Sequence, residues 1–178
     1  IGNGGDRTSS SNTATGNITV AAGNLTLTGA SSLNAGQGYA LIGNSAVHNS
    51  SVANSGVASG NISINVKGQT KVQMTDGAGE AWIGNVAIGG TETGALSLIT
   101  GTFANTDNHL DQFILADLVG GDVTIGVTNA NTSNAVDGLS YSSANALTIL
   151  TAGDLTITGS VVNSGTGDIT LVTGWKPS

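Results

Sequence analysis

Acidic and imidazole side chains gather at one place in the chain, the segment Asp107-Asn108-His109-Leu110-Asp111, with Asp117 shortly after it. Carboxylates held close together can coordinate calcium or serve as the acid and base of glycoside hydrolysis. The alternative is a solvated loop, and we favour it. Both histidines, His48 and His109, fall in expected loops, which leaves too few parts for a zinc site or a catalytic triad. We therefore expect no catalytic, cofactor-binding or metal-binding residue.

The charge balance narrows the range of partners. The 178 residues carry a formal charge of −7, and the only basic side chains are those of Arg7, Lys67, Lys71 and Lys176. A basic footprint for nucleic acid is missing, so we expect no nucleic-acid partner. There is no cysteine, hence no disulfide and no thiolate metal site. No apolar run reaches the length of about 18 residues that a membrane span needs, and we see no signal peptide.

Any functional site must be positioned by the short segments in which apolar and hydroxyl residues alternate. Ile18-Thr19-Val20, Ile62-Ser63-Ile64 and Leu147-Thr148-Ile149 are examples. This period of two is typical of half-buried strands with apolar side chains inward. Only 8% of residues are charged, against about 25% in average domains, while 28 glycines supply turns. Gly or Asn interrupts nearly every window of ten, so we expect an all-β chain without long helices.

A long-range repeat organises these segments. Ala40-Leu41-Ile42-Gly43-Asn44 returns as Ala81-Trp82-Ile83-Gly84-Asn85, and the chain opens on Ile1-Gly2-Asn3. Ile1, Ile42 and Ile83 are thus spaced by 41 residues each. A fixed period of this size signals a solenoid, in which each unit buries its apolar face against the next. We expect the three isoleucines to form one inward ladder.

Grouping the segments predicts about five coils with three short strands per coil and variable loops. Insertions are expected at Gly4–Thr15, Ser45–Ser59 and Thr128–Gly138. The organisation is one solenoid segment, 1–178, with regular repeats over 1–90, irregular coils over 91–138 and final coils over 139–178. The expected strands are Asn17–Val20, Asn24–Thr28, Tyr39–Ile42, Asn61–Val66, Lys71–Thr75, Ala81–Ile83, Leu96–Ile99, a piece near Phe103, Phe113–Leu115, Asp122–Val127, Ala146–Leu150, Asp154–Thr158 and Asp168–Val172.

These phrases resemble the shaft repeats of a known family. The segments Gly16–Gly29, Tyr39–Asn44, Ser59–Ile64, Ala81–Asn85 and Asn145–Trp175 look like the β-helical shaft of filamentous haemagglutinin-like exoproteins, bacterial adhesins exported by two-partner secretion. The resemblance implies a right-handed parallel β-helix, a secreted, extracellular or bacterial cell-surface location, and a structural or adhesive role. Thr91–Asp137 matches the pattern poorly. The chain contains neither the Asn-Pro of the family's secretion domain nor Arg-Gly-Asp.

Two classes of function follow. The first is a non-enzymatic structural or adhesive shaft segment of a secreted surface protein or filament, without cofactor. The second is a polysaccharide-processing lyase or hydrolase on the same fold, since solenoids host both roles. For the first class the expected partners are neighbouring coils of the same polypeptide, identical copies stacked head to tail, or a host or cell-surface receptor or glycan. We expect the chain to be part of a longer repetitive polypeptide.

Three surface features have competing interpretations. Asn17, Asn24, Asn49, Asn61 and Asn131 each begin an Asn-X-Ser/Thr sequon, which we interpret as turn plus strand rather than as glycosylation. The outward hydroxyl column is too irregular in Thr and Ser for an ice-binding face. For a third group, Tyr39, Trp82 and Phe113, we favour packing against apolar neighbours over stacking on a saccharide. The turn from Asp76 to Glu80 lacks the rhythm of a calcium-binding β-roll.

Overall fold

The protein is known from a computed structural model, and the structure describes residues 1–2, 13–29, 39–46, 56–74, 80–87, 90–104 and 120–178. Over these ranges all regular structure is β-strand, with no helix. The strand pairs among the described residues are all parallel. The expectation of an all-β chain is confirmed for the part of the chain described.

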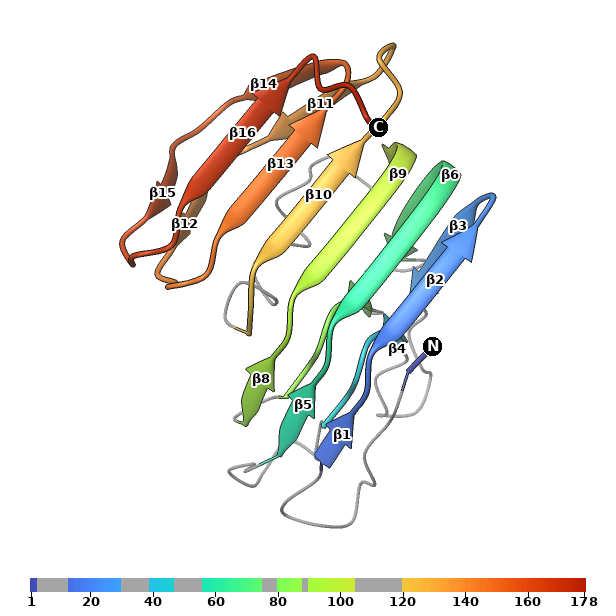
Figure 1. Cartoon of the computed structure of the whole chain (residues 1–178), viewed down its shortest axis with the longest axis vertical. Helices are drawn as coiled ribbons and strands as arrows, with labels where there is room; N and C mark the ends of the chain where they lie inside the picture. Colours follow the sequence, from blue (N-terminus) through green and yellow to red (C-terminus); the bar gives the residue numbers. More distant parts are fainter. Residues whose placement is uncertain (3–12, 30–38, 47–55, 75–79, 88–89, 105–119) are drawn as a thin grey trace.

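One large sheet, here called the main sheet, holds the chain together (Figure 1). Six of its strands lie side by side and point the same way in the order β16-β13-β10-β9-β6-β2, and a seventh, β3, pairs with the second half of β6. The strands are β2 (Ile18–Ala22), β3 (Leu25–Gly29), β6 (Ile62–Met74), β9 (Leu96–Ala104), β10 (Val123–Val127), β13 (Leu147–Thr151) and β16 (Ile169–Thr173).

Four smaller parallel sheets accompany it. Three strands make one of them, in the order β1-β5-β8, and the others are the pairs β4-β7, β11-β14 and β12-β15. Figure 1 shows β1, β5 and β8 in a row that continues the line of β2, β6 and β9. Their bounds are β1 (Thr13–Thr15), β4 (Tyr39–Ile42), β5 (Val57–Ser59), β7 (Glu80–Ile83), β8 (Thr91–Thr93), β11 (Ser133–Val136), β12 (Leu139–Tyr141), β14 (Asp154–Ile157) and β15 (Val161–Asn163).

The core consists of apolar columns that run across the main sheet from strand to strand. Alternation places one set of residues inward on each strand, and the strand registers align these sets. Inner members such as Ile64, Leu98 and Ile149 are at most 2% exposed. The first column contains Ile18, Ile62, Leu96, Val123, Leu147 and Ile169; the second contains Val20, Ile64, Leu98, Ile125, Ile149 and Leu171.

The number of residues between aligned positions falls along the chain. Asn17 and Asn61 are 44 residues apart, Asn61 and Ala95 are 34 apart, and Asp122 and Ala146 only 24. The apolar columns of the main sheet nevertheless stay aligned, because the connections between aligned strands absorb the difference in length.

The 41-residue repeat is confirmed where both copies are described, with one correction. Ile42 and Ile83 pair in register in β4 and β7 and are 1% and 3% exposed. Ile1 is also in line, because its carbonyl accepts the Gly43 amide and its terminal amine donates to the Leu41 carbonyl. Its side chain is nevertheless 71% exposed, so the prediction that it is buried in the ladder is wrong. Ile1 lies at the outer edge of this ladder, and the apolar stack covers it on one side only.

Most expected strands are present, and the errors are local. The pieces Asn61–Val66 and Lys71–Thr75 are one long strand, β6, with a register irregularity between Val66 and Gln69. All three expected insertions contain a short strand: β1, β5 and β11 respectively. The expected strand Phe113–Leu115 lies outside the described residues, as does most of the turn at 76–80. The division into 1–90, 91–138 and 139–178 stays a prediction.

Candidate functional site

The acidic cluster singled out in the sequence lies outside the described residues. This holds for Asp107–Asp111, Asp117 and both histidines. Within the described ranges no group of three or more His, Cys, Asp or Glu side chains is placed to hold a metal ion. The sequence expectation of no metal or catalytic site therefore stays a prediction.

One described carboxyl group has a shifted pKa. Glu92, in β8, is in register with Ala14 and Ala58, which are buried at 2% and 0% exposure, so it occupies a position that faces the interior. Burial raises the pKa of Glu92, and a hydrogen bond from the Ala87 amide to its Oε1, 2.6 Å long, partly offsets that rise. The carboxyl group thus ties β8 to the segment before it, which is a structural role.

A ladder of side-chain oxygens borders the main sheet. Asn17 precedes β2, and its Oδ1 accepts the amide of Asn61 at 2.9 Å; Asn61 in turn accepts the amide of Ala95 at 3.0 Å. Further along, Asp122 accepts the amide of Ala146 at 2.8 Å. These oxygens satisfy backbone donors just outside the strand ladder, where no carbonyl reaches them. The sequons at Asn17 and Asn61 thus have a use in the fold.

The repeated Gly-Asn phrase builds a second, buried ladder. Asn44 is fully buried, and its Nδ2 donates to the carbonyls of Gly16 and Ser59 at 2.8 and 2.9 Å. It also reaches Asn85 Oδ1 at 3.0 Å. Asn85 repeats the arrangement one strand further, on Gly60 and Thr93 at 2.8 and 3.0 Å. Each amide therefore clamps the corner at which the chain leaves a short strand and enters the main sheet.

Glycine is required at that corner. Gly60 has a φ of +133°, and a Cβ there would lie 2.2 Å from the Gly16 carbonyl oxygen. Only glycine combines this backbone conformation with such a close approach. The Gly-Asn phrases of the sequence therefore encode a corner as much as a strand.

A third asparagine does the same work without belonging to the repeat. Asn163, at the end of β15, donates from Nδ2 to the carbonyls of Ser143 and Gly167 at 2.9 and 2.7 Å. Its Oδ1 accepts the amides of Ser143 and Gly165. Gly167 precedes β16 as Gly16 precedes β2, so the carbonyl that is clamped is equivalent. Sequence reasoning missed this residue because no Ile-Gly-Asn phrase surrounds it.

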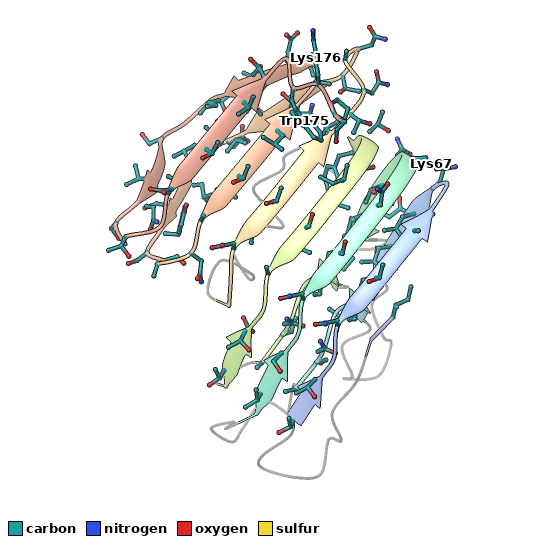
Figure 2. All side chains as sticks on the ribbon, viewed as in Figure 1. Lys67, Trp175 and Lys176 are labelled. Atoms are coloured by element: carbon teal, nitrogen blue, oxygen red, sulfur yellow. The ribbon has the colours of Figure 1, made fainter. Side chains whose placement is uncertain are left out.

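The outer face of the main sheet carries two different columns. One is a column of hydroxyl groups, all exposed or half-buried. The next contains Ile99, Gly126, Leu150 and Val172, and Trp175 closes over it: a Cβ at Gly126 would lie 3.0 Å from Cζ3 of the indole. Figure 2 shows Trp175 at the end of the sheet beside β10. The hydroxyl column is Thr19, Ser63, Ser97, Thr124, Thr148 and Thr170.

The aromatic group expected from the sequence is only partly described. The register sets Tyr39 opposite Glu80 and Trp82 opposite Leu41, so the two aromatic residues occupy different positions of the β4-β7 pair. Phe113 lies outside the described residues. The preference for packing over stacking on a saccharide stays a prediction.

Three buried polar atoms of the described residues have no hydrogen-bond partner: Thr70 Oγ1, Asn134 Nδ2 and Tyr141 Oη. Burial raises the pKa of Tyr141, so its phenol is neutral at ordinary pH. These residues come from three different strands, and none joins the carboxylate Glu92 in a group that could move a proton.

No protein-family model, curated protein or solved structure matches the chain. Among the described residues, no helix has the length and apolar character needed to cross a membrane. The interior columns, the asparagine clamps and the outer columns are therefore the features from which a function can be argued.

Proposed function

We propose that the chain is a structural shaft segment of a secreted bacterial surface protein or extracellular filament, built as a right-handed parallel β-helix. The observation that supports this most is the main sheet, in which six parallel strands keep their apolar columns aligned while the spacing of aligned residues falls from 44, between Asn17 and Asn61, to 22, between Leu147 and Ile169. A winding chain with loops of variable length produces this pattern. In this proposal each of the six strands belongs to one coil, one more than the sequence suggested.

The chemistry of the described side chains also favours a shaft. The inward columns are apolar, and the buried polar groups Asn44 and Asn85 are used to clamp backbone corners. The described carboxyl with a raised pKa, Glu92, bonds to a backbone amide. A structural element needs a repeated core and satisfied corners, and these residues supply both.

The location proposed for the protein can be tested on cells. Antibodies raised against the purified chain should label intact cells of the source organism, and brief protease treatment of those cells should remove the label. Labelling that needs permeabilised cells would contradict a surface location.

The enzymatic alternative has its own test. Because we expect no turnover, incubation with acidic and neutral polysaccharides should release no new reducing or unsaturated ends. Turnover that disappears in Asp107→Asn or Asp111→Asn would establish the lyase or hydrolase instead. The exposed variant Asp154→Asn is the matched control, since it removes a carboxylate elsewhere on the chain.

A further inference from the structure

The second apolar column of the main sheet is incompletely covered at both ends. In the second column the inner residues Ile64, Leu98, Ile125 and Ile149 are between 0% and 2% exposed. The end members, Val20 on β2 and Leu171 on β16, are only half-buried. Each inner residue is covered by a neighbour on both sides, and each end residue by a neighbour on one side. An added strand at either edge would complete the burial.

The backbone at these edges points hydrogen-bonding groups outward. On β13 the Leu147 amide donates to the Asp168 carbonyl, and on β2 the Ile18 amide donates to the Asn61 carbonyl. In a parallel pair, alternate residues of one strand bond to the strand on either side. It follows that the amide of Leu171 points away from β13, and that the amide of Thr19 points away from β6.

Within the described residues, neither edge strand carries the side chains that normally prevent strand addition. Protective edges use proline, charged side chains, especially lysine, or inward-pointing charges. The strands Ile18–Ala22 and Ile169–Thr173 contain no charged residue and no proline. Both are five residues long, and each is the last strand on its side of the main sheet.

The two edges also match each other residue for residue. Setting β2 on β16 in the register of the inner pairs places Ile18 against Ile169 and Val20 against Leu171, which continues both apolar columns. Thr19 then meets Thr170 and extends the hydroxyl column. Just before the strands, Asp168 takes the position from which Asn17, Asn61 and Asp122 each accept an amide of the neighbouring segment.

We propose that the β16 edge of one copy binds the β2 edge of a second copy, in parallel, with Asp168 accepting the Asn17 amide of that copy. The inference rests on the proposed function, because it treats the copies as consecutive pieces of one shaft. The strand spacing across the junction is about 4.8 Å, as within a sheet. Two different surfaces meet, so the contact is heterologous and assembly is open-ended.

Two proline variants block one edge each. Leu171→Pro removes the amide that points out of the β16 edge, and Thr19→Pro removes the one that points out of the β2 edge. Neither substitution removes a hydrogen bond within the chain, so both variants are expected to fold. Thr148→Pro in β13 is the matched control: the same residue type on an inner strand loses an internal bond and is expected to melt at a much lower temperature. Circular dichroism with thermal melting establishes which variants are folded.

Analytical ultracentrifugation then measures the size of the assemblies that each chain forms. The unmodified chain should sediment as a ladder of species that lengthens with concentration, and each edge variant alone should stay monomeric. A mixture of Leu171→Pro and Thr19→Pro should form a 1:1 dimer and nothing longer, because one open β16 edge meets one open β2 edge. Leu171→Lys keeps the backbone amide and adds a charge at the end of the apolar column, so it should also be monomeric. This variant keeps the test valid if Leu171→Pro fails to fold.

The possible failures point to different conclusions. An unmodified chain that remains monomeric at millimolar concentration would overturn the proposed contact, as would assembly that survives in either folded edge variant. A mixture that forms no dimer would overturn the pairing of these two edges. The proposed function fails separately, through antibody labelling confined to permeabilised cells.

Discussion

At the scale of single residues, the fold depends on asparagine more than on charge. Asn44, Asn85 and Asn163 each donate a hydrogen bond to the carbonyl of the glycine that leads into a strand of the main sheet, namely Gly16, Gly60 and Gly167. The sequence shows the repeated Gly-Asn phrase, but its purpose depends on carbonyls that are distant along the chain. Asn85 and Gly60, for example, are 25 residues apart. Sequence spacing alone therefore located two of the three clamps and explained none of them.

The clamp can be tested by substitution. Asn85→Ala removes the donors to Gly60 and Thr93 and the acceptor for the Asn44 amide. The Thr93 carbonyl keeps its hydrogen bond from the Gly60 amide, whereas the side-chain bonds that join the corner to β7 are lost. We expect the free energy of unfolding to fall by roughly 2–4 kcal/mol. Asn65→Ala is the control, since Asn65 is exposed on β6 and should change stability by less than about 0.5 kcal/mol. Equal effects of the two variants in urea unfolding would contradict a special role for Asn85.

Glu92 gives a prediction about pH. Burial raises the pKa of Glu92 above the ordinary value of a glutamate, so the folded chain binds this proton more tightly than the unfolded chain does. The protonated carboxyl therefore contributes stability below the unfolded value, and that contribution is lost as pH rises through the folded value. The melting temperature of the unmodified chain, relative to Glu92→Gln, should fall as pH is raised from 4 to 7. A constant or rising difference would contradict the desolvation of Glu92.

At the scale of elements, alternation predicts the strands that carry large inward residues. Ile62-Ser63-Ile64 and Leu147-Thr148-Ile149 are located from sequence because two β-formers flank a hydroxyl residue. Alternation does not predict the short strands β1 and β5, because the buried residue of each is alanine, a weak β-former. Each strand is instead stabilised by pairing with its neighbour. The break expected near Gly68 is a register irregularity inside one strand, since β9 pairs with β6 on both sides of it.

The β4-β7 pair provides the element-scale test. Ile83 is 3% exposed and packs in the main apolar cluster, so Ile83→Asp buries a carboxylate without a partner. We expect the Ile83→Asp chain either to be unfolded or to melt about ten degrees or more below the unmodified chain. Ser63→Asp is the control, because Ser63 is exposed on the outer face of β6. A melting temperature for Ile83→Asp equal to that of Ser63→Asp would show that this ladder does not hold the fold together.

At the scale of the whole molecule, the arrangement is close to one-dimensional. Each strand of the main sheet contacts the strand before and after it, and sequence-distant rows such as β2 and β16 meet only through the rows between them. In such a stack stability is the sum of neighbour interactions, so end rows hold one interface and inner rows two. Stability should therefore be graded along the sheet.

Hydrogen exchange on the monomeric chain measures that gradient. The amides of Thr124 and Thr170 occupy the same column, and each points toward the preceding strand of the sheet, Thr124 in β10 and Thr170 in the edge strand β16. We expect Thr170 to exchange at least tenfold faster, because opening the last row breaks one interface whereas opening an inner row breaks two. The variant Leu171→Lys keeps the chain monomeric during the measurement. Equal protection at the two sites would mean that the molecule opens as one cooperative unit, which a stack of neighbour-coupled rows does not do.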